Sequence, residues 1–210
     1  MNAKTKQSRF GSLELAWRVA VICAVLFTGR GVSAQLVSKP FSADKVVTKR
    51  GKTTTDKVYA TPTAMREEGV QNGKKFISIT RFDRKVLWSI MPDEKMYFEM
   101  AIPAGAEVAA AMTELSKGMM KDAQVKQESL GSEQVEGFHC DKTRMTVSWE
   151  GITSTTTEWT AKELGGFVVK KQDEALGEFT EYKNIRLGPQ DPSLFELPAG
   201  YKKMSMSGRQ

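Results

Sequence analysis

The sequence predicts an α+β domain, in which an antiparallel sheet or open barrel surrounds one main helix. About ten short runs of strand-forming residues follow one another between turn signals. Only the segment 107–121 has helical periodicity, whereas a parallel sheet would need several crossover helices. No repeat or low-complexity linker divides the chain, so we expect a single domain over residues 35–201.

The first 34 residues read as a cleavable secretory leader. Lys4 and other basic residues precede an apolar run at 19–27, and Val32-Ser33-Ala34 supplies small residues ahead of Gln35. A helix needs about 20 apolar residues to cross a membrane, so no stable transmembrane segment is expected after cleavage. We expect export by the general secretory route to the periplasm, with secretion as the second choice.

Removal of the leader changes the charge of the chain. The leader holds five of the 31 basic residues and one of the 25 acidic residues, so the remaining 176 residues carry a net charge of +2. Their charges alternate in sign, which gives nucleic-acid binding little support. Only Cys140 remains after cleavage, so an intramolecular disulfide is excluded. A small buried residue is the ordinary reading of Cys140, and an intermolecular disulfide or a reactive thiol is the alternative.

The predicted strands before the helix are rich in Val, Thr and aromatic residues. Gly51 and Asn72-Gly73 mark hairpin turns, because both residue types tolerate positive φ. In the last of these strands Met96, Phe98 and Met100 alternate on one face. The expected strands span residues 41–50, 53–61, 64–68, 75–82, 85–91 and 95–100.

The helix is predicted from an apolar stripe. Val108, Met112, Leu115 and Met119 recur at spacings of four, three and four residues. Burial of each would contribute about 1.5–3 kcal/mol, so the helix should lie against the sheet.

Further strands are expected after the helix, at 124–130, 138–149, 152–160, 164–171 and 177–187. Two prolines in the segment 191–201 indicate a capping turn and coil, and residues 202–210 are expected to form a disordered tail.

Catalytic patterns are weak in this sequence. His139 and Cys140 are adjacent, and sequential residues of a strand point to opposite faces, so a catalytic pair is disfavoured. One histidine and one cysteine cannot form a zinc site, and the acidic residues fall mainly at turns. Nucleophile-elbow, phosphate-loop and dinucleotide motifs are absent from the sequence. We therefore expect no enzyme activity, no cofactor and no metal.

Apolar side chains are the more informative feature. Ten methionines and three tryptophans follow the leader. Core filling is their ordinary interpretation, and a ligand cleft between sheet and helix is the sharper one. The candidate ligand-binding residues are Trp88, Met96, Phe98, Met112, Leu115, Met119 and Trp149.

Several stretches resemble an exported bacterial family known as domain of unknown function 4412. They are FSADKVVTKRGKTTTDKVYATPTAMREE, RFDRKVLWSIMPDEKMYFEM, EWTAKELGGFVVKK and DPSLFELPAGYKKM. In order, they cover most of the chain after the leader. The family carries no established activity.

The strand pair at 85–95 and the closing Phe195, Pro198 and Gly200 also resemble, more distantly, the LolA-like periplasmic lipoprotein carriers. This resemblance implies a strongly curved antiparallel sheet, a half-barrel, with helix packed on its concave side and acyl chains bound there. It also implies that Arg66, which follows Met65, latches a helical lid.

The leading hypothesis is a non-enzymatic periplasmic protein that binds a lipid, an acyl chain or a lipidated partner such as a lipoprotein in a sheet–helix cleft. The alternative is a structural or protein-interaction domain of the cell envelope, with the cleft fully packed and no small-molecule ligand.

Overall fold

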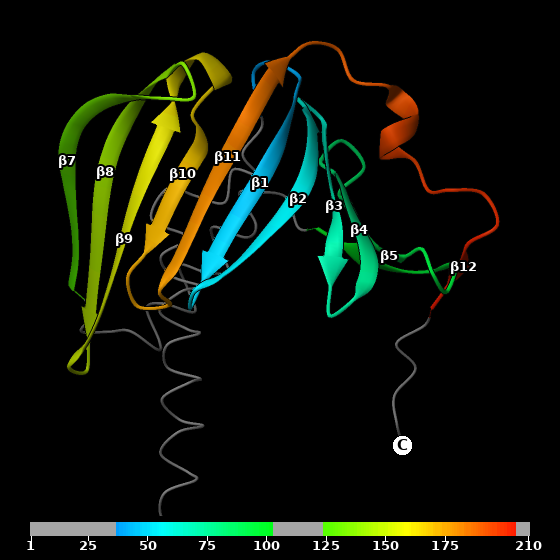
Figure 1. Ribbon diagram of the computed structural model, residues 1–210, viewed down its shortest axis with the longest axis horizontal. Coiled ribbons are helices and arrows are strands. Elements are labelled where there is room, and N and C mark those ends of the chain that lie inside the picture. Colours follow the sequence, from blue (N-terminus) through cyan, green and yellow to red (C-terminus); the bar gives the residue numbers. More distant parts are fainter. Residues whose placement is uncertain (1–36, 103–123, 205–210) are drawn as a thin grey trace, which may run out of the picture.

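The computed structural model describes residues 37–102 and 124–204 (Figure 1). These residues form one open sheet of twelve strands, in the order β12-β6-β5-β4-β3-β2-β1-β11-β10-β9-β8-β7. Neighbouring strands are antiparallel except for β12 and β6, which are parallel. The strands are β1 Phe41–Lys49, β2 Lys52–Thr61, β3 Ala64–Gln71, β4 Lys74–Arg81, β5 Val86–Met91, β6 Met96–Ala101, β7 Gln124–Val135, β8 Phe138–Trp149, β9 Ile152–Ala161, β10 Phe167–Asp173, β11 Glu178–Leu187 and β12 Lys202–Lys203.

Four of the hairpins close through two-residue loops that end in glycine. Both residues of each loop have positive φ, which is the geometry of the type I′ turn that matches the twist of paired strands. A non-glycine residue therefore takes the left-handed conformation at the first loop position of each hairpin. The loops are Arg50-Gly51, Asn72-Gly73, Glu136-Gly137 and Glu150-Gly151.

The predicted fold class, α+β with one main helix packed on the concave side of the sheet, is wrong for the part of the chain that the structure describes. There the only helices are two short 3-10 turns, η1 Lys162–Leu164 and η2 Pro192–Phe195. Most connections between the described strands are tight turns, so they leave no room for an α-helix, and the architecture is β. The segment expected to form the helix, 107–121, lies outside the described residues.

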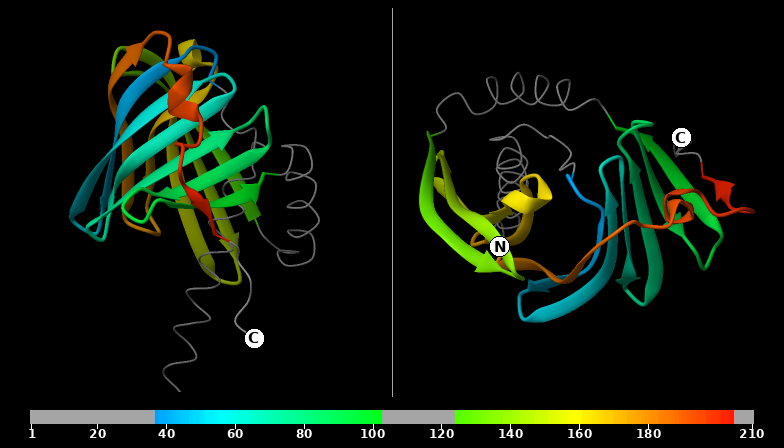
Figure 2. Two further views of the ribbon diagram at one scale, coloured as in Figure 1. Left: turned by 90° about the vertical axis from the view of Figure 1, so that its right-hand side faces the viewer. Right: turned by 90° about the horizontal axis from the view of Figure 1, so that it is seen from above.

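The sheet is strongly curved, so that β7–β9 and β3–β6 form two arms on either side of the central strands β1, β2 and β11 (Figure 2). Register shifts occur in three strand pairs: β1 with β11, β9 with β10, and β7 with β8. Such bulges bend a strand and increase its twist. The third lies near Gly131, where the strand expected to end at residue 130 continues to Val135.

The C-terminal segment crosses from the middle of the sheet to one edge. It leaves β11, forms η2 and then pairs with β6 through β12, and the Met204 amide donates to the Tyr97 carbonyl at 2.8 Å. In Figure 2 this segment lies on the outside of the curve, over β3–β6. The ordered chain thus extends past residue 201, the predicted boundary of the domain.

Two apolar clusters hold the sheet. One lies around the central strands, where Phe167 makes edge contacts with Phe41 and Tyr182, with ring centroids 5.2 and 4.8 Å apart. The second lies between β3–β6 and the C-terminal segment, with Phe195 packed against Ile79, Trp88 and Ile90.

Candidate functional site

The cross-strand pairing assigns side chains to the two faces of the sheet. Followed pair by pair from β6 to β8, it places Met96, Phe98 and Trp149 on one face. Trp88 and Phe195 lie on the other face, which the C-terminal segment covers. Because that segment lies outside the curve, the face that carries Phe98 is the concave one (Figure 2).

Apolar side chains lie on the concave face of both arms. On one arm they come from β5 and β6, and on the other from β7, β8 and β9. Met100 and Val125, one on each arm, are 42% and 57% exposed. In β5–β9 the apolar concave residues are Leu87, Met91, Met96, Phe98 and Met100 on the first arm, and Val125, Met145, Val147, Trp149 and Ile152 on the second.

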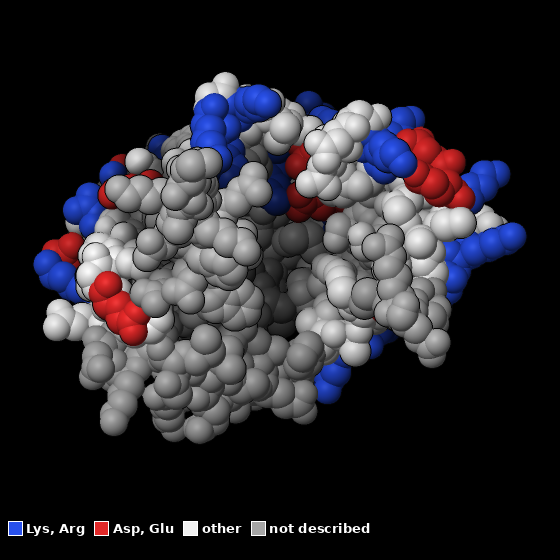
Figure 3. Space-filling model, turned by 90° about the horizontal axis from the view of Figure 1, so that it is seen from below, with Lys and Arg blue, Asp and Glu red and all other residues white. Residues whose placement is uncertain are grey.

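Figure 3 shows the molecule from below, end-on to the strands drawn in Figure 1. Acidic and basic side chains of the described residues are interspersed around this face rather than gathered by sign. The exposed Met100 and Val125 give the concave face exposed apolar area, which often marks a binding surface.

The structure separates Trp88 from Met96 and Phe98, with which it was grouped as a candidate ligand-binding residue. Trp88 is buried, and its Nε1 donates to Glu99 Oε2 at 3.0 Å. It packs beneath the C-terminal segment, so its indole belongs to the core of the convex side. The candidates Met112, Leu115 and Met119 lie outside the described residues.

Arg66 also lies on the convex side. Its Nη1 donates to the Leu194 carbonyl at 3.0 Å, and its Nη2 donates to Glu68 at 2.7 Å. Arg81, from β4, donates in the same way to the Phe195 carbonyl at 3.2 Å. Both arginines thus tie the C-terminal segment to the sheet. The predicted latching of a helical lid by Arg66 stays a prediction.

A polar cluster occupies the centre of the concave face. Lys45 donates to both carboxylate oxygens of Glu67, at 2.8 and 3.0 Å, and lies between Asp56 and Tyr182 in neighbouring strands. Burial, with help from the neighbouring Glu67 carboxylate, raises the pKa of Asp56. Burial likewise raises the pKa of Tyr182.

The absence of a side chain at Gly69 leaves space for the carboxyl group of Asp56. A Cβ atom at residue 69 would lie 1.8 Å from Asp56 Oδ1, so only glycine leaves room for this carboxyl group. Sequence reasoning missed the cluster, although a glycine inside a strand pattern is a signal of close approach. Glu67 and Glu68 lie within β3, whereas the sequence predicts acidic residues mainly at turns.

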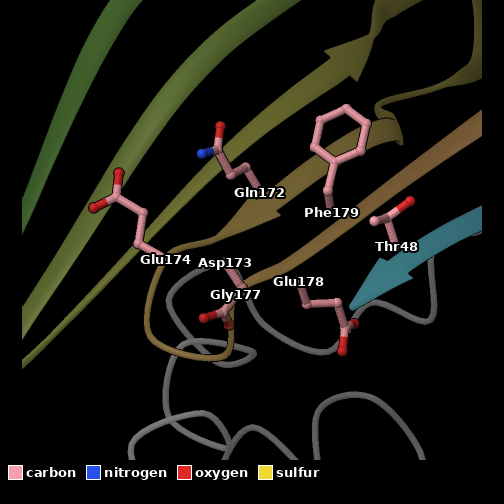
Figure 4. A pocket seen from close by; sticks show the side chains of 7 residues that line it. All are labelled: Thr48, Gln172, Asp173, Glu174, Gly177, Glu178 and Phe179. Carbon is pink, nitrogen blue, oxygen red and sulfur yellow. The ribbon is translucent and has the colours of Figure 1, made fainter. Parts of the chain in front are cut away.

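An open pocket of about 410 Å³ lies at the hairpin between β10 and β11 (Figure 4). Its carboxylates serve the hairpin itself: Asp173 accepts from the Leu176 amide at 2.9 Å, and Glu178 accepts from Lys49 at 2.9 Å. Gln172 and Phe179 project on one side of the hairpin and Glu178 on the other, so the pocket straddles its end. It is lined by Thr48, Gln172, Asp173, Glu174, Gly177, Glu178 and Phe179.

The side chains of His139 and Cys140 lie in different environments, as expected for neighbours on a strand. Cys140 is a free, fully buried cysteine, and burial raises the pKa of its thiol, which keeps it protonated. His139 is exposed and its Nδ1 lies 3.0 Å from Glu163 Oε1. This arrangement supplies no activated nucleophile.

No group of three or more His, Cys, Asp or Glu side chains in residues 37–102 and 124–204 could hold a metal ion. Within the same ranges, no helix has the length and apolar character needed to span a membrane.

Comparison with protein families matches residues 45–169, more than half of the chain, to a domain of unknown function, DUF4412. No curated protein matches the chain.

Among solved structures, an uncharacterized conserved protein from Thermus thermophilus matches 87% of this chain and 98% of its own, with 13% identity and a TM-score of 0.52. This likeness bears on the fold. The Pseudomonas aeruginosa MucA/MucB complex matches 82% of this chain and 60% of its own, at 14% identity and TM-score 0.46. The Mycobacterium tuberculosis lipoprotein LppX matches 82% and 98%, at 13% identity and TM-score 0.40.

Proposed function

We propose a binding function for this chain, which belongs to the DUF4412 family: it is a non-enzymatic periplasmic protein that holds an acyl chain, free or attached to a lipidated partner, on the concave face of its sheet. The observation that carries the proposal is the register, which gives both arms of the curved sheet apolar side chains on the same face. A chain of methylene groups lying between the arms would contact both.

The character of these side chains supports an acyl ligand. Met91, Met96 and Met100 supply flexible thioethers, which adapt to variable apolar shapes, and Phe98 and Trp149 supply broad rings. Burial of apolar surface contributes about 25 cal/mol per Å², so a long acyl chain that contacts both arms would bind with useful affinity. Export to the periplasm, predicted from the leader, places the protein where lipids and lipoproteins are handled.

The test uses protein purified from the periplasm after expression of the full-length chain. Lipid extraction and mass spectrometry should find bound acyl species, and a fluorescent fatty-acid probe should bind. Met100→Glu and Val125→Glu should each reduce probe affinity at least tenfold, because a carboxylate would then lie in the path of the chain.

Val70→Glu is the matched control, since Val70 is 56% exposed but lies on the convex face. It should leave probe affinity unchanged. If no acyl species is extracted and the probe does not bind the unmodified protein, the proposal is wrong, and an envelope domain that binds a protein partner becomes the better account.

A further inference from the structure

We propose that the ligand carries an uncharged polar group, an ester, amide or hydroxyl, and that this group hydrogen-bonds to Ser154 and Thr156 of β9. This inference rests on the acyl-binding function proposed above and specifies the chemistry of the ligand.

Ser154 and Thr156 are the first observation. Their side chains lie on the concave face and are only 2% and 3% exposed. Across the part of the chain that the structure describes, neither Ser154 Oγ nor Thr156 Oγ1 has a hydrogen-bond partner. A buried hydroxyl without a partner is costly and rare, so a bound group that supplies one would be favoured.

The neighbours of these hydroxyls are suited to an acyl chain. Ser154 pairs across the sheet with Val147, and Trp149 lies on the same face at the end of β8. Thr156 pairs with Asp173, whose Oδ1 already accepts the Leu176 amide. The hydroxyls therefore lie beside apolar side chains, of which Val147 is fully buried and Trp149 is partly exposed.

The charges of the concave face are the second observation. Four lysines lie there on β1, β2 and β10. Lys52 is exposed opposite Lys49 at the end of the β1–β2 hairpin, and each of the other three has a glutamate partner on a neighbouring strand. An anionic headgroup that recruited one of them would leave a carboxylate without its partner, which is unfavourable in a partly buried site. The pairs are Lys45 with Glu67 at 2.8 Å, Lys49 with Glu178 at 2.9 Å and Lys171 with Glu158 at 3.7 Å.

An uncharged carbonyl or hydroxyl avoids this conflict. It can accept a hydrogen bond from Ser154 or Thr156 without disturbing any of the three ion pairs. The same acyl chain should therefore bind more tightly as an ester than as a free carboxylate.

The experiment measures displacement of a fluorescent naphthylamine probe from the full-length protein by palmitoyl glycerol and by palmitate. We expect palmitoyl glycerol to displace the probe at a concentration at least tenfold lower. The double variant S154A/T156V should bind palmitoyl glycerol about tenfold more weakly, which is the effect expected from the loss of two hydrogen bonds. Its affinity for palmitate should change less.

Thr157→Val is the matched control, because Thr157 is also buried, at 4% exposure, but lies on the opposite face of the same strand. Since the concave hydroxyls have no partner among the described residues, S154A/T156V should unfold at the same temperature as the unmodified protein or higher, which thermal melting checks.

The outcomes separate the two proposals. Equal displacement by both ligands, or an unchanged response of S154A/T156V, overturns the uncharged-group inference and leaves acyl binding in place. Failure of the probe and of both palmitoyl ligands to bind overturns the proposed function and this inference together.

Discussion

Phe195 and Phe98 show how differently the two faces of one sheet are used. On the convex face Phe195 is brought by the C-terminal segment and is buried against Ile79, Trp88 and Ile90. On the concave face Phe98 is partly buried in β6, and Met100, two residues along the same face, is 42% exposed. On the convex face the C-terminal segment covers the apolar side chains of β4 and β5. On the concave face Val58 and Val147 are buried as well, but Met100 and Val125 at the two arms stay exposed, and it is these exposed side chains that are available for binding.

Substitution of Phe195 should produce the largest effect on stability. Phe195→Ala would leave a cavity beneath the C-terminal segment and lower the free energy of unfolding by about 3–5 kcal/mol, measured by urea denaturation. Phe98→Ala should cost only about 1–2 kcal/mol, because its side chain is half-buried. Equal costs for the two phenylalanines would contradict the division between a structural and a binding face.

Gly69 tests the crowded centre of the concave face. Gly69→Ala would force Asp56 aside and should cost about 1–3 kcal/mol. The double variant D56A/G69A should be more stable than the sum of the two single effects predicts, because the clash is then removed. Thermal unfolding of the four proteins in this cycle measures the coupling, and strict additivity would show that the two residues do not meet.

Arg66 tests the attachment of the C-terminal segment. Arg66→Gln removes the hydrogen bond to the Leu194 carbonyl and should cost about 1–3 kcal/mol. Arg84→Gln, which removes an exposed ion pair with Glu196, should cost less than about 1 kcal/mol. Both are measured by urea denaturation, and proteolysis between η2 and β12 should increase only in the first variant.

The smallest expected effect is on the pH dependence of stability, which should differ between Asp56 on the concave face and Glu196 in the C-terminal segment. The pKa of Asp56 is raised by burial, so the folded protein holds this proton more tightly and loses stability as pH rises above the ordinary value of 3.8. Asp56→Asn should therefore gain stability, relative to the unmodified protein, as pH rises through that range.

The contribution of Glu196 to stability should change with pH in the opposite direction to that of Asp56. Arg84, and then Arg81, lower its pKa, so its contribution is present above the ordinary value of 4.5 and is lost as pH falls. Glu196→Gln should lose stability at neutral pH and approach the unmodified protein in acid. Thermal unfolding across this pH range checks both variants, and trends of the same sign would contradict the assignment.

Much of the strand pattern could be predicted from the sequence, because local signals are strong. Asn72-Gly73 predicts a type I′ hairpin, and Met96, Phe98 and Met100 alternate as expected for a strand with one apolar face. The continuation of β7 past Gly131 was missed, because a glycine inside a strand can mark a bulge as well as an end.

Local sequence signals do not show which face of the sheet is covered and which is left exposed. Trp88 and Phe98 lie on adjacent strands, and their sequence patterns do not say which face the C-terminal segment will cover. That depends on residues 192–203 returning across the sheet, a long-range contact without a local signature. The unpartnered hydroxyls of Ser154 and Thr156 could not be predicted either, because Ser and Thr are common in strands and their partners depend on the folded structure.

The return of the C-terminal segment has a consequence for how the protein is made. Strands β1–β6 emerge early during synthesis, but the residues that cover Ile79, Trp88 and Ile90 follow β11, the last strand of the central part of the sheet. Until they arrive, that side of the sheet has no completed core and its β6 edge is open. The convex side of β3–β6 is therefore completed only after η2 and β12 have been synthesised, so formation of this core depends on contacts between segments far apart in the sequence.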